Sequence, residues 1–190
     1  MEDGLKKLLA RKRIKSNYKY CIICDIDNVV IDSRKWVINP PKKTRNRPWS
    51  VVRAAWDKIH SNMLRDCKPN RHMINLLLTV IPILPVVFIT GREDRNNVRE
   101  NTMKQLKVYS KGIFEFGQNY FIYFREEGDY RPAHEMKEDI VKYLIEDTEL
   151  VPLLAIDDEI DNCEMYSRNN IPYYLYDIES KRLIGENEND

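Results

Sequence analysis

Carboxylate side chains follow two separate apolar runs of the sequence. Asp25 and Asp27 follow one run, and Asp157 and Asp158 end another. Charged groups at the end of a buried strand are costly unless a cation or ligand compensates them. Mg²⁺ takes oxygen ligands of this kind, which makes these four residues candidate metal ligands. Either pair alone is also typical of an Asp-rich turn or of the start of a helix.

Two further segments carry groups that can hold a phosphoryl group. Thr90-Gly91-Arg92 follows the apolar residues 86–89. A hydroxyl, a glycine amide and the free N–H groups of a following helix can bind phosphate oxygens. Lys137 lies in a segment rich in acids. Taken alone, the tripeptide is common in strand-to-helix turns and the lysine is typical of an exposed helix face.

Apolar runs and helical periodicity predict elements that would position these residues. Alternating strands and helices indicate an α/β fold, a Rossmann-like three-layer sandwich around a mostly parallel sheet. Ligands of such sheets bind beyond the carboxyl ends of the strands, and the aspartate pairs and Thr90-Gly91-Arg92 lie at such ends. The predicted strands are 20–31, 83–90, 121–125, 153–156 and 173–176; the predicted helices are 5–16, 49–64, 70–80, 94–107, 134–147 and 160–169.

The chain order of the four segments resembles that of the haloacid dehalogenase superfamily of phosphatases, over about 20–176. The resemblance implies that Asp25 attacks phosphorus to form an aspartyl-phosphate and that Asp27 serves as general acid and then base. It implies that Thr90 and Lys137 hold the phosphoryl oxygens. It also implies Mg²⁺ as cofactor, held by the Asp25 carboxylate, the Asp27 backbone carbonyl and one of Asp157 and Asp158.

Two segments carry a narrower resemblance, to the 3′-phosphatase domain of phage-type polynucleotide kinase-phosphatases and to related phage nucleotidases. Residues 124–132 are similar to an R-x-x-G-D-x-R segment of that family, and 157–166 to its D-D-x-x-x-x-x-E-M-[WY] helix start. The chain departs from the pattern at Ala133, where an acid is usual, and at Thr90, where serine is frequent. The candidate substrate-binding residues are Gly91, Arg92, Arg125, Arg131 and Arg34.

Length and charge suggest one phosphatase domain over 1–190, with a basic N-terminal helix at 1–17 and a small cap insertion at 32–70. Residues 1–75 hold 18 basic and 7 acidic residues, whereas 76–190 hold 13 and 23. Basic groups flanked by tryptophans suit single-stranded nucleic-acid ends, although a solvated basic loop explains them equally well. The insertion contains Arg34, Lys35, Lys42, Lys43, Arg45 and Arg47, together with Trp36 and Trp49.

Several classes of protein are excluded or disfavoured. No apolar stretch is long enough for a membrane span and the N-terminus lacks a secretory signal, so a cytoplasmic location is expected. No G-x-x-x-x-G-K-[ST] occurs, which disfavours a kinase. Cys21 and Cys24 would lie on opposite faces of a strand, so all four cysteines are expected to be buried and free.

The sequence therefore predicts a Mg²⁺-dependent phosphomonoesterase, with a polynucleotide 3′-phosphatase as the first hypothesis. Its substrate would be a phosphorylated nucleic-acid end. A 5′(3′)-nucleotidase acting on nucleoside monophosphates is the alternative, and a non-catalytic nucleic-acid-binding protein of the same fold is a third possibility. The choice between DNA and RNA and the oligomeric state stay open at this point.

Overall fold

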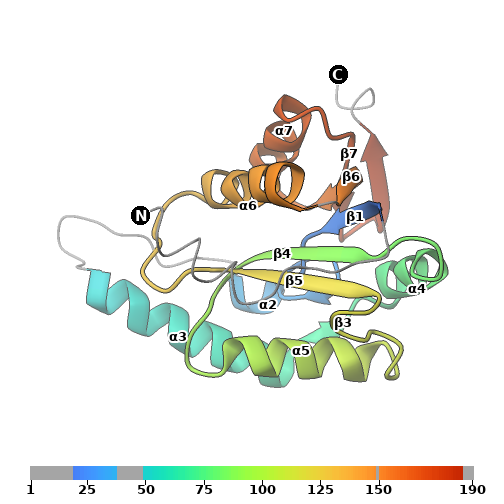
Figure 1. Ribbon diagram of the computed structural model, residues 1–190. Coiled ribbons are helices and arrows are strands. Elements are labelled where there is room, and N and C mark those ends of the chain that lie inside the picture. Colours follow the sequence, from blue (N-terminus) through green and yellow to red (C-terminus); the bar gives the residue numbers. More distant parts are fainter. Residues whose placement is uncertain (1–18, 38–48, 149, 186–190) are drawn as a thin grey trace.

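A six-stranded sheet in the order β5-β4-β1-β6-β7-β8 forms the centre of the molecule (Figure 1). The computed structural model describes residues 19–37, 49–148 and 150–185. The strands of this sheet are β1 (Tyr20–Cys24), β4 (Val86–Glu93), β5 (Tyr120–Arg125), β6 (Val151–Asp157), β7 (Tyr173–Asp177) and β8 (Arg182–Gly185). The described helices are α2 (Arg34–Val37), α3 (Trp49–Asp66), α4 (Arg71–Val80), α5 (Val98–Tyr109), α6 (Ala133–Asp147) and α7 (Ile160–Arg168).

The sheet is parallel except at one edge, which confirms the predicted fold class. β1 pairs in parallel with both β4 and β6, and only β8 runs antiparallel to its neighbour, β7. The chain proceeds from β1 to β4 and β5 on one side and then to β6 and β7 on the other. The connections thus change direction beside β1, the position at which open α/β sheets bind their ligands.

Helices cover both faces of the sheet and bury two apolar clusters. Residues of α4 and α5 pack on one face, and residues of α6 and α7 pack on the other (Figure 1). Cys24 belongs to the first cluster and Cys21 to the second, as the alternation of a strand requires. All four cysteines are buried and free, as expected.

The predicted strand over 20–31 is wrong in its second half. β1 ends at Cys24, and the chain turns through Asn28, whose φ of 58° is left-handed. Backbone N–H groups of Val30 and Ile31 donate to the carbonyl of Ile26, which closes the turn. The apolar residues of the turn are buried all the same. The run was predicted to be a strand because it is apolar. Its residues are apolar because they are buried, and burial does not require an extended backbone.

Other element boundaries differ from the prediction at the strand ends. β4 begins only at Val86, because the turn at 81–85 contains two prolines, and it continues to Glu93. α5 begins at Val98 rather than near 94, after Asn97 in a left-handed conformation. The edge strand β8 was not predicted.

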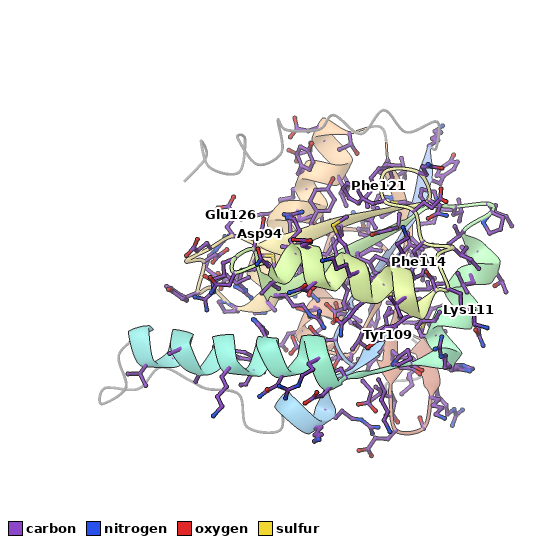
Figure 2. All side chains as sticks on the ribbon, turned by 90° about the horizontal axis from the view of Figure 1, so that it is seen from below. Asp94, Tyr109, Lys111, Phe114, Phe121 and Glu126 are labelled. Carbon is purple, nitrogen blue, oxygen red and sulfur yellow. The ribbon has the colours of Figure 1, made fainter. Side chains whose placement is uncertain are left out.

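The segment after β1 leaves and rejoins the sheet domain through a short pair of strands. β2 (Ile31–Asp32) pairs antiparallel with β3 (Lys68–Pro69). Between them, α3 packs along α5 (Figure 2), and the hydroxyl of Tyr109 at the end of α5 donates to the carbonyl of Cys67 at 2.6 Å. The boundaries 1–17 and 32–70 stay predictions.

Part of the predicted basic surface lies outside the described residues. This applies to the N-terminal helix and to Lys42, Lys43, Arg45 and Arg47. The side chains of Trp36 and Trp49 are likewise not described. Among the helices of the described chain, none is long and apolar enough to cross a membrane.

A buried asparagine links the turn after β1 to β7. The amide nitrogen of Asn70 donates to the Val29 carbonyl at 2.6 Å and to the Tyr176 hydroxyl at 2.8 Å. We expect Asn70→Ala to lower the free energy of unfolding by about 1–3 kcal/mol, because it leaves a buried carbonyl unpaired. Tyr176→Phe is expected to cost less, and Tyr174→Phe, a half-exposed residue of the same strand, close to nothing. Urea denaturation of the three variants would contradict this if all three behaved alike.

Candidate active site

The two predicted carboxylate segments meet where β1 and β6 end. Cys24 and Ile156 are partners in the parallel pairing, so the residues that follow them lie side by side. One carboxylate oxygen from each of Asp25, Asp157 and Asp158 lies within 4.8 Å of the others. The adjacency follows from strand pairing between segments more than a hundred residues apart in the chain.

Lys137 of α6 lies between two of these carboxylates. Its Nζ is 2.7 Å from Oδ1 of Asp25 and 2.7 Å from Oδ2 of Asp157. The lysine side chain is only 2% exposed. Burial acts to lower the pKa of Lys137, but Asp157 and Asp25 raise it well above its ordinary value. The ammonium therefore stays charged and joins α6 to the ends of both central strands.

Asp157 receives further hydrogen bonds from the start of α7. Its Oδ1 accepts from Nδ2 of Asn162 at 2.8 Å and from the backbone N–H of Glu159 at 3.2 Å. The hydroxyl of Tyr166, one turn beyond Asn162, lies 3.5 Å from Oδ2. These contacts fix both oxygens of a fully buried carboxylate.

Burial and neighbouring charges strongly influence the pKa values of Asp158 and Asp25. Burial first, and Asp157 next, raise the pKa of Asp158 to about 7, while a hydrogen bond from Asn28 opposes the rise. Burial also raises the pKa of Asp25 well above its ordinary value, with Asp157 and Asp158 adding to it and Lys137 opposing it. Both carboxyl groups thus need an additional cation to remain ionised at low cost.

The donor set fits a hard divalent cation. Three carboxylates face one ammonium, so the ionised cluster carries two negative charges in excess of the positive one. Clustered carboxylate oxygens are the ligands that Mg²⁺ prefers. Asp25, Asp157 and Asp158 are therefore the side chains that would hold it.

The carboxylate of Asp27 turns away from this cluster toward Arg92. Nε and Nη2 of Arg92 donate to the two oxygens at 2.9 and 2.8 Å. The guanidinium is 1% exposed, and Nη1 donates to Thr102 and Gln105 of α5. Burial acts to raise the pKa of Asp27, but Arg92 outweighs it and holds the pKa below its ordinary value. Arg92 thus uses its nitrogens to hold Asp27, and its role in substrate binding stays a prediction.

An irregularity in β4 brings Arg92 into this position. Thr90 pairs with Phe124 and Glu93 with Arg125, so Gly91 and Arg92 are extra residues between two matched pairs. Bulges of this kind re-aim side chains at strand ends. The buried Thr90 hydroxyl accepts the Arg92 backbone N–H at 3.2 Å, which closes the turn.

Hydrogen bonds hold the loop after β5 against the irregular end of β4. Nε of Arg125 donates to the Gly91 carbonyl at 3.2 Å, and its Nη1 donates to the carbonyl of Arg131 at 2.8 Å. A carboxylate oxygen of Glu93 accepts the N–H of Gly128 at 2.6 Å. The neighbouring residues Asp94 and Glu126, labelled in Figure 2, mark the carboxyl ends of β4 and β5.

The predicted substrate-binding arginines make their contacts within the protein. Arg125 holds the loop, whereas Arg131 pairs with Asp129 and Asp139 at its surface. Arg34 pairs with Asp32, at 2.9 Å, and with Glu179. Arg131 and Arg34 are 40% and 43% exposed, and their role in substrate binding stays a prediction.

The side chains of Asn28, Asn162 and Tyr166 contact Asp157 or Asp158 and were missed by the sequence analysis. Asn28 directly follows Asp27, and Asn162 and Tyr166 lie four apart on α7. The helical spacing after Asp158 was a usable signal, since it places both side chains on one face at the helix start. Asn28 gave no such signal, because asparagine is ordinary in a turn.

Comparison with known proteins finds the same fold in solved structures of low sequence identity. A haloacid dehalogenase-like family hydrolase from Streptococcus pneumoniae aligns with a TM-score of 0.58 and 13% identity, over 83% of this chain and 84% of that one. A putative β-phosphoglucomutase from Thermotoga maritima aligns with a TM-score of 0.50 and 14% identity, over 83% and 85%. No family model and no curated protein matches the sequence. The likeness therefore concerns the haloacid dehalogenase-like fold.

The raised pKa of Asp158 predicts how pH affects stability without metal. A carboxyl whose pKa is about 7 in the folded protein and near 4 in the unfolded chain loses stability as pH rises between these values. In EDTA, we expect the melting temperature of the wild type to fall relative to that of Asp158→Asn between about pH 5 and pH 7.5. Added Mg²⁺ should raise the wild-type melting temperature more at the higher pH. A constant difference across this range would contradict the assignment.

Proposed function

We propose that this protein is a Mg²⁺-dependent phosphomonoesterase that works through an aspartyl-phosphate. The observation that carries the proposal is the cluster of Asp25, Lys137, Asp157 and Asp158 beyond the carboxyl ends of β1 and β6. It lies where this fold binds its ligands. A fold neighbour that is itself named a hydrolase supports the same class of reaction.

Asp25 is the nucleophile in this proposal. Lys137 donates to Oδ1, so the other carboxylate oxygen is the one that attacks phosphorus as the bond to the leaving oxygen breaks. Lys137 keeps Asp25 oriented and supplies a fixed positive charge beside the phosphoryl group, with Thr90 on the other side. A charge that is already in place requires no rearrangement during the reaction.

Asp27 moves protons in both halves of the reaction. Its pairing with Arg92 keeps it ionised, which suits it to take a proton from the water that attacks the aspartyl-phosphate. In the first half it must be protonated to give a proton to the leaving alkoxide. Because Arg92 lowers the pKa of Asp27, it favours the ionised form that the second half requires over the protonated form that the first half requires.

Mg²⁺ would be held by the carboxylates of Asp25, Asp157 and Asp158 and by the backbone carbonyl of Asp27. When bound, it neutralises charge on the phosphoryl oxygens and on the nucleophile. The protein contributes the fixed geometry: Asn162 and Lys137 hold Asp157, and Asn28 holds Asp158.

The substrate we propose is a 3′-phosphorylated nucleic-acid end. Support comes from the resemblance of 124–132 and 157–166 to phage-type 3′-phosphatases. Glu93 and Arg125 fasten the first of these segments to the end of β4, the strand that carries Thr90, a proposed phosphoryl-binding residue. A nucleotidase with the same residues is the second candidate. A non-catalytic binding protein is disfavoured by the assembled carboxylate cluster.

Replacement of the nucleophile tests the mechanism. We expect Asp25→Asn to reduce Mg²⁺-dependent phosphate release by about 10³-fold or more, because the amide cannot form the phosphoenzyme. Asp161→Asn, at an exposed acid of the first turn of α7, is the matched control and should retain wild-type activity. Equal rates for wild type and Asp25→Asn would rule out the nucleophile assignment.

A comparison of substrates tests the proposed specificity. A 3′-phosphorylated oligonucleotide should be hydrolysed with a higher kcat/KM than 3′- or 5′-mononucleotides, and its KM should rise with salt as phosphate contacts weaken. Preference for mononucleotides with no salt dependence would favour the nucleotidase. Tight, salt-sensitive oligonucleotide binding without turnover would favour the non-catalytic alternative.

A further inference from the structure

Asn28 occupies a backbone position that does not itself require an amide side chain. Its φ is 58°, and its N–H donates to the Ile31 carbonyl at 2.7 Å, closing the turn after Asp27. Glycine adopts this left-handed conformation with the least strain, and asparagine is one of the few other residues that tolerate it. What asparagine adds to the turn is its side chain.

Both ends of that side chain are used. Nδ2 of Asn28 donates to Oδ2 of Asp158 at 2.9 Å. Oδ1 accepts from the hydroxyl of Ser33, a fully buried residue, at 2.9 Å. Because the hydroxyl donates to the carbonyl end, the NH₂ end is held toward the carboxylate. The turn after β1 thus reaches across to the end of β6.

Asp158 depends on this contact more than its neighbours depend on theirs. Asp25 and Asp157 share the buried ammonium of Lys137, and Asp157 is held by α7 as well. The carboxylate of Asp158 receives its hydrogen bond from Asn28 and is partly exposed. With Oδ2 engaged by the amide, Oδ1 is the oxygen that remains available to a cation.

We propose that Asn28, held by Ser33, is a positioning residue that keeps the Asp158 carboxylate in the orientation that binds Mg²⁺. The proposal rests on the Mg²⁺ site of the proposed function. Groups that orient a metal ligand raise affinity because the ligand no longer has to be ordered on binding, and their loss typically costs 10–100-fold in metal affinity.

Ser33 also faces the other acid of the segment. A hydrogen bond from its hydroxyl lowers the pKa of Asp27, after Arg92 and His60, and since a hydroxyl has one proton it is donated to Asn28 or to Asp27 at any moment. Replacement of Ser33 therefore affects proton transfer as well as the position of Asn28. Metal binding in the absence of substrate separates the two effects, because Asp27 lends no side-chain oxygen to the carboxylate cluster.

The test measures Mg²⁺ binding to the metal-free protein by isothermal titration calorimetry. Asn28→Gly keeps the left-handed turn and removes the amide, and we expect it to raise the dissociation constant for Mg²⁺ by about tenfold. Asn170→Gly is the matched control: its φ is also 58°, and its side chain is exposed after α7. It should bind Mg²⁺ as the wild type does.

Activity provides a second readout that separates positioning from general damage. For Asn28→Gly, the Mg²⁺ concentration at half-maximal rate should rise, and saturating Mg²⁺ should restore most of kcat. A lower kcat with unchanged Mg²⁺ dependence would overturn the proposal, as would unchanged calorimetric affinity. If Asn28→Gly does not fold, Ser33→Ala is the variant to measure. We expect a smaller loss of Mg²⁺ affinity from it, and an unchanged affinity would overturn the proposal.

The wild type separates this inference from the proposed function. A wild type that binds no Mg²⁺ would refute both the metal site and the inference. A wild type that binds Mg²⁺, with a variant that binds it equally well, would refute the inference alone.

Discussion

The buried ammonium of Lys137 is the interaction on which the rest of the site depends. It lies 2.7 Å from carboxylates at the ends of two adjacent strands, and it comes from a helix that packs on one face of the sheet. A buried carboxylate without a cation is very costly, and removal of one partner of a buried pair is correspondingly damaging. Lys137 therefore allows Asp25 and Asp157 to lie together in the protein interior, at the carboxyl ends of β1 and β6.

The other carboxylates of the site are also held in place by hydrogen bonds from neighbouring elements. Each carboxylate is held by a different part of the chain: Asp157 by α7, Asp158 by the turn after β1, and Asp27 by Arg92 from the irregular end of β4. The apolar clusters on the two faces of the sheet place these elements, and hydrogen bonds set the final orientation of each side chain. The carboxylates at the carboxyl end of the sheet are thus held by groups from α6, α7, β4 and the turn after β1.

The sequence was sufficient to predict the elements that contain long apolar runs and the residues that end them. Asp25, Thr90 and Asp157 are recognisable because charged or polar groups at strand ends are conspicuous against an apolar background. Lys137 lies on a helix, and only the resemblance to a known family singled it out. The direction of each side chain was not predictable. Arg92 was predicted to bind substrate because a glycine-arginine turn suits phosphate, and nothing in the sequence indicated that the two extra residues of β4 would bury its side chain against Asp27. Asn28 escaped notice because its partner is 130 positions away in the chain.

The short antiparallel pair of β2 and β3 has a consequence for how this protein can vary. It brings Asp32 and Lys68 together, so the segment between them begins and ends at one point beside the domain. Closing a longer loop between fixed ends adds little entropic cost. Segments of other lengths and compositions can therefore be exchanged at this stem while Asp25, Lys137 and Asp157, which all lie outside it, keep their places. This makes the stem a natural position for new recognition surfaces beside the candidate site.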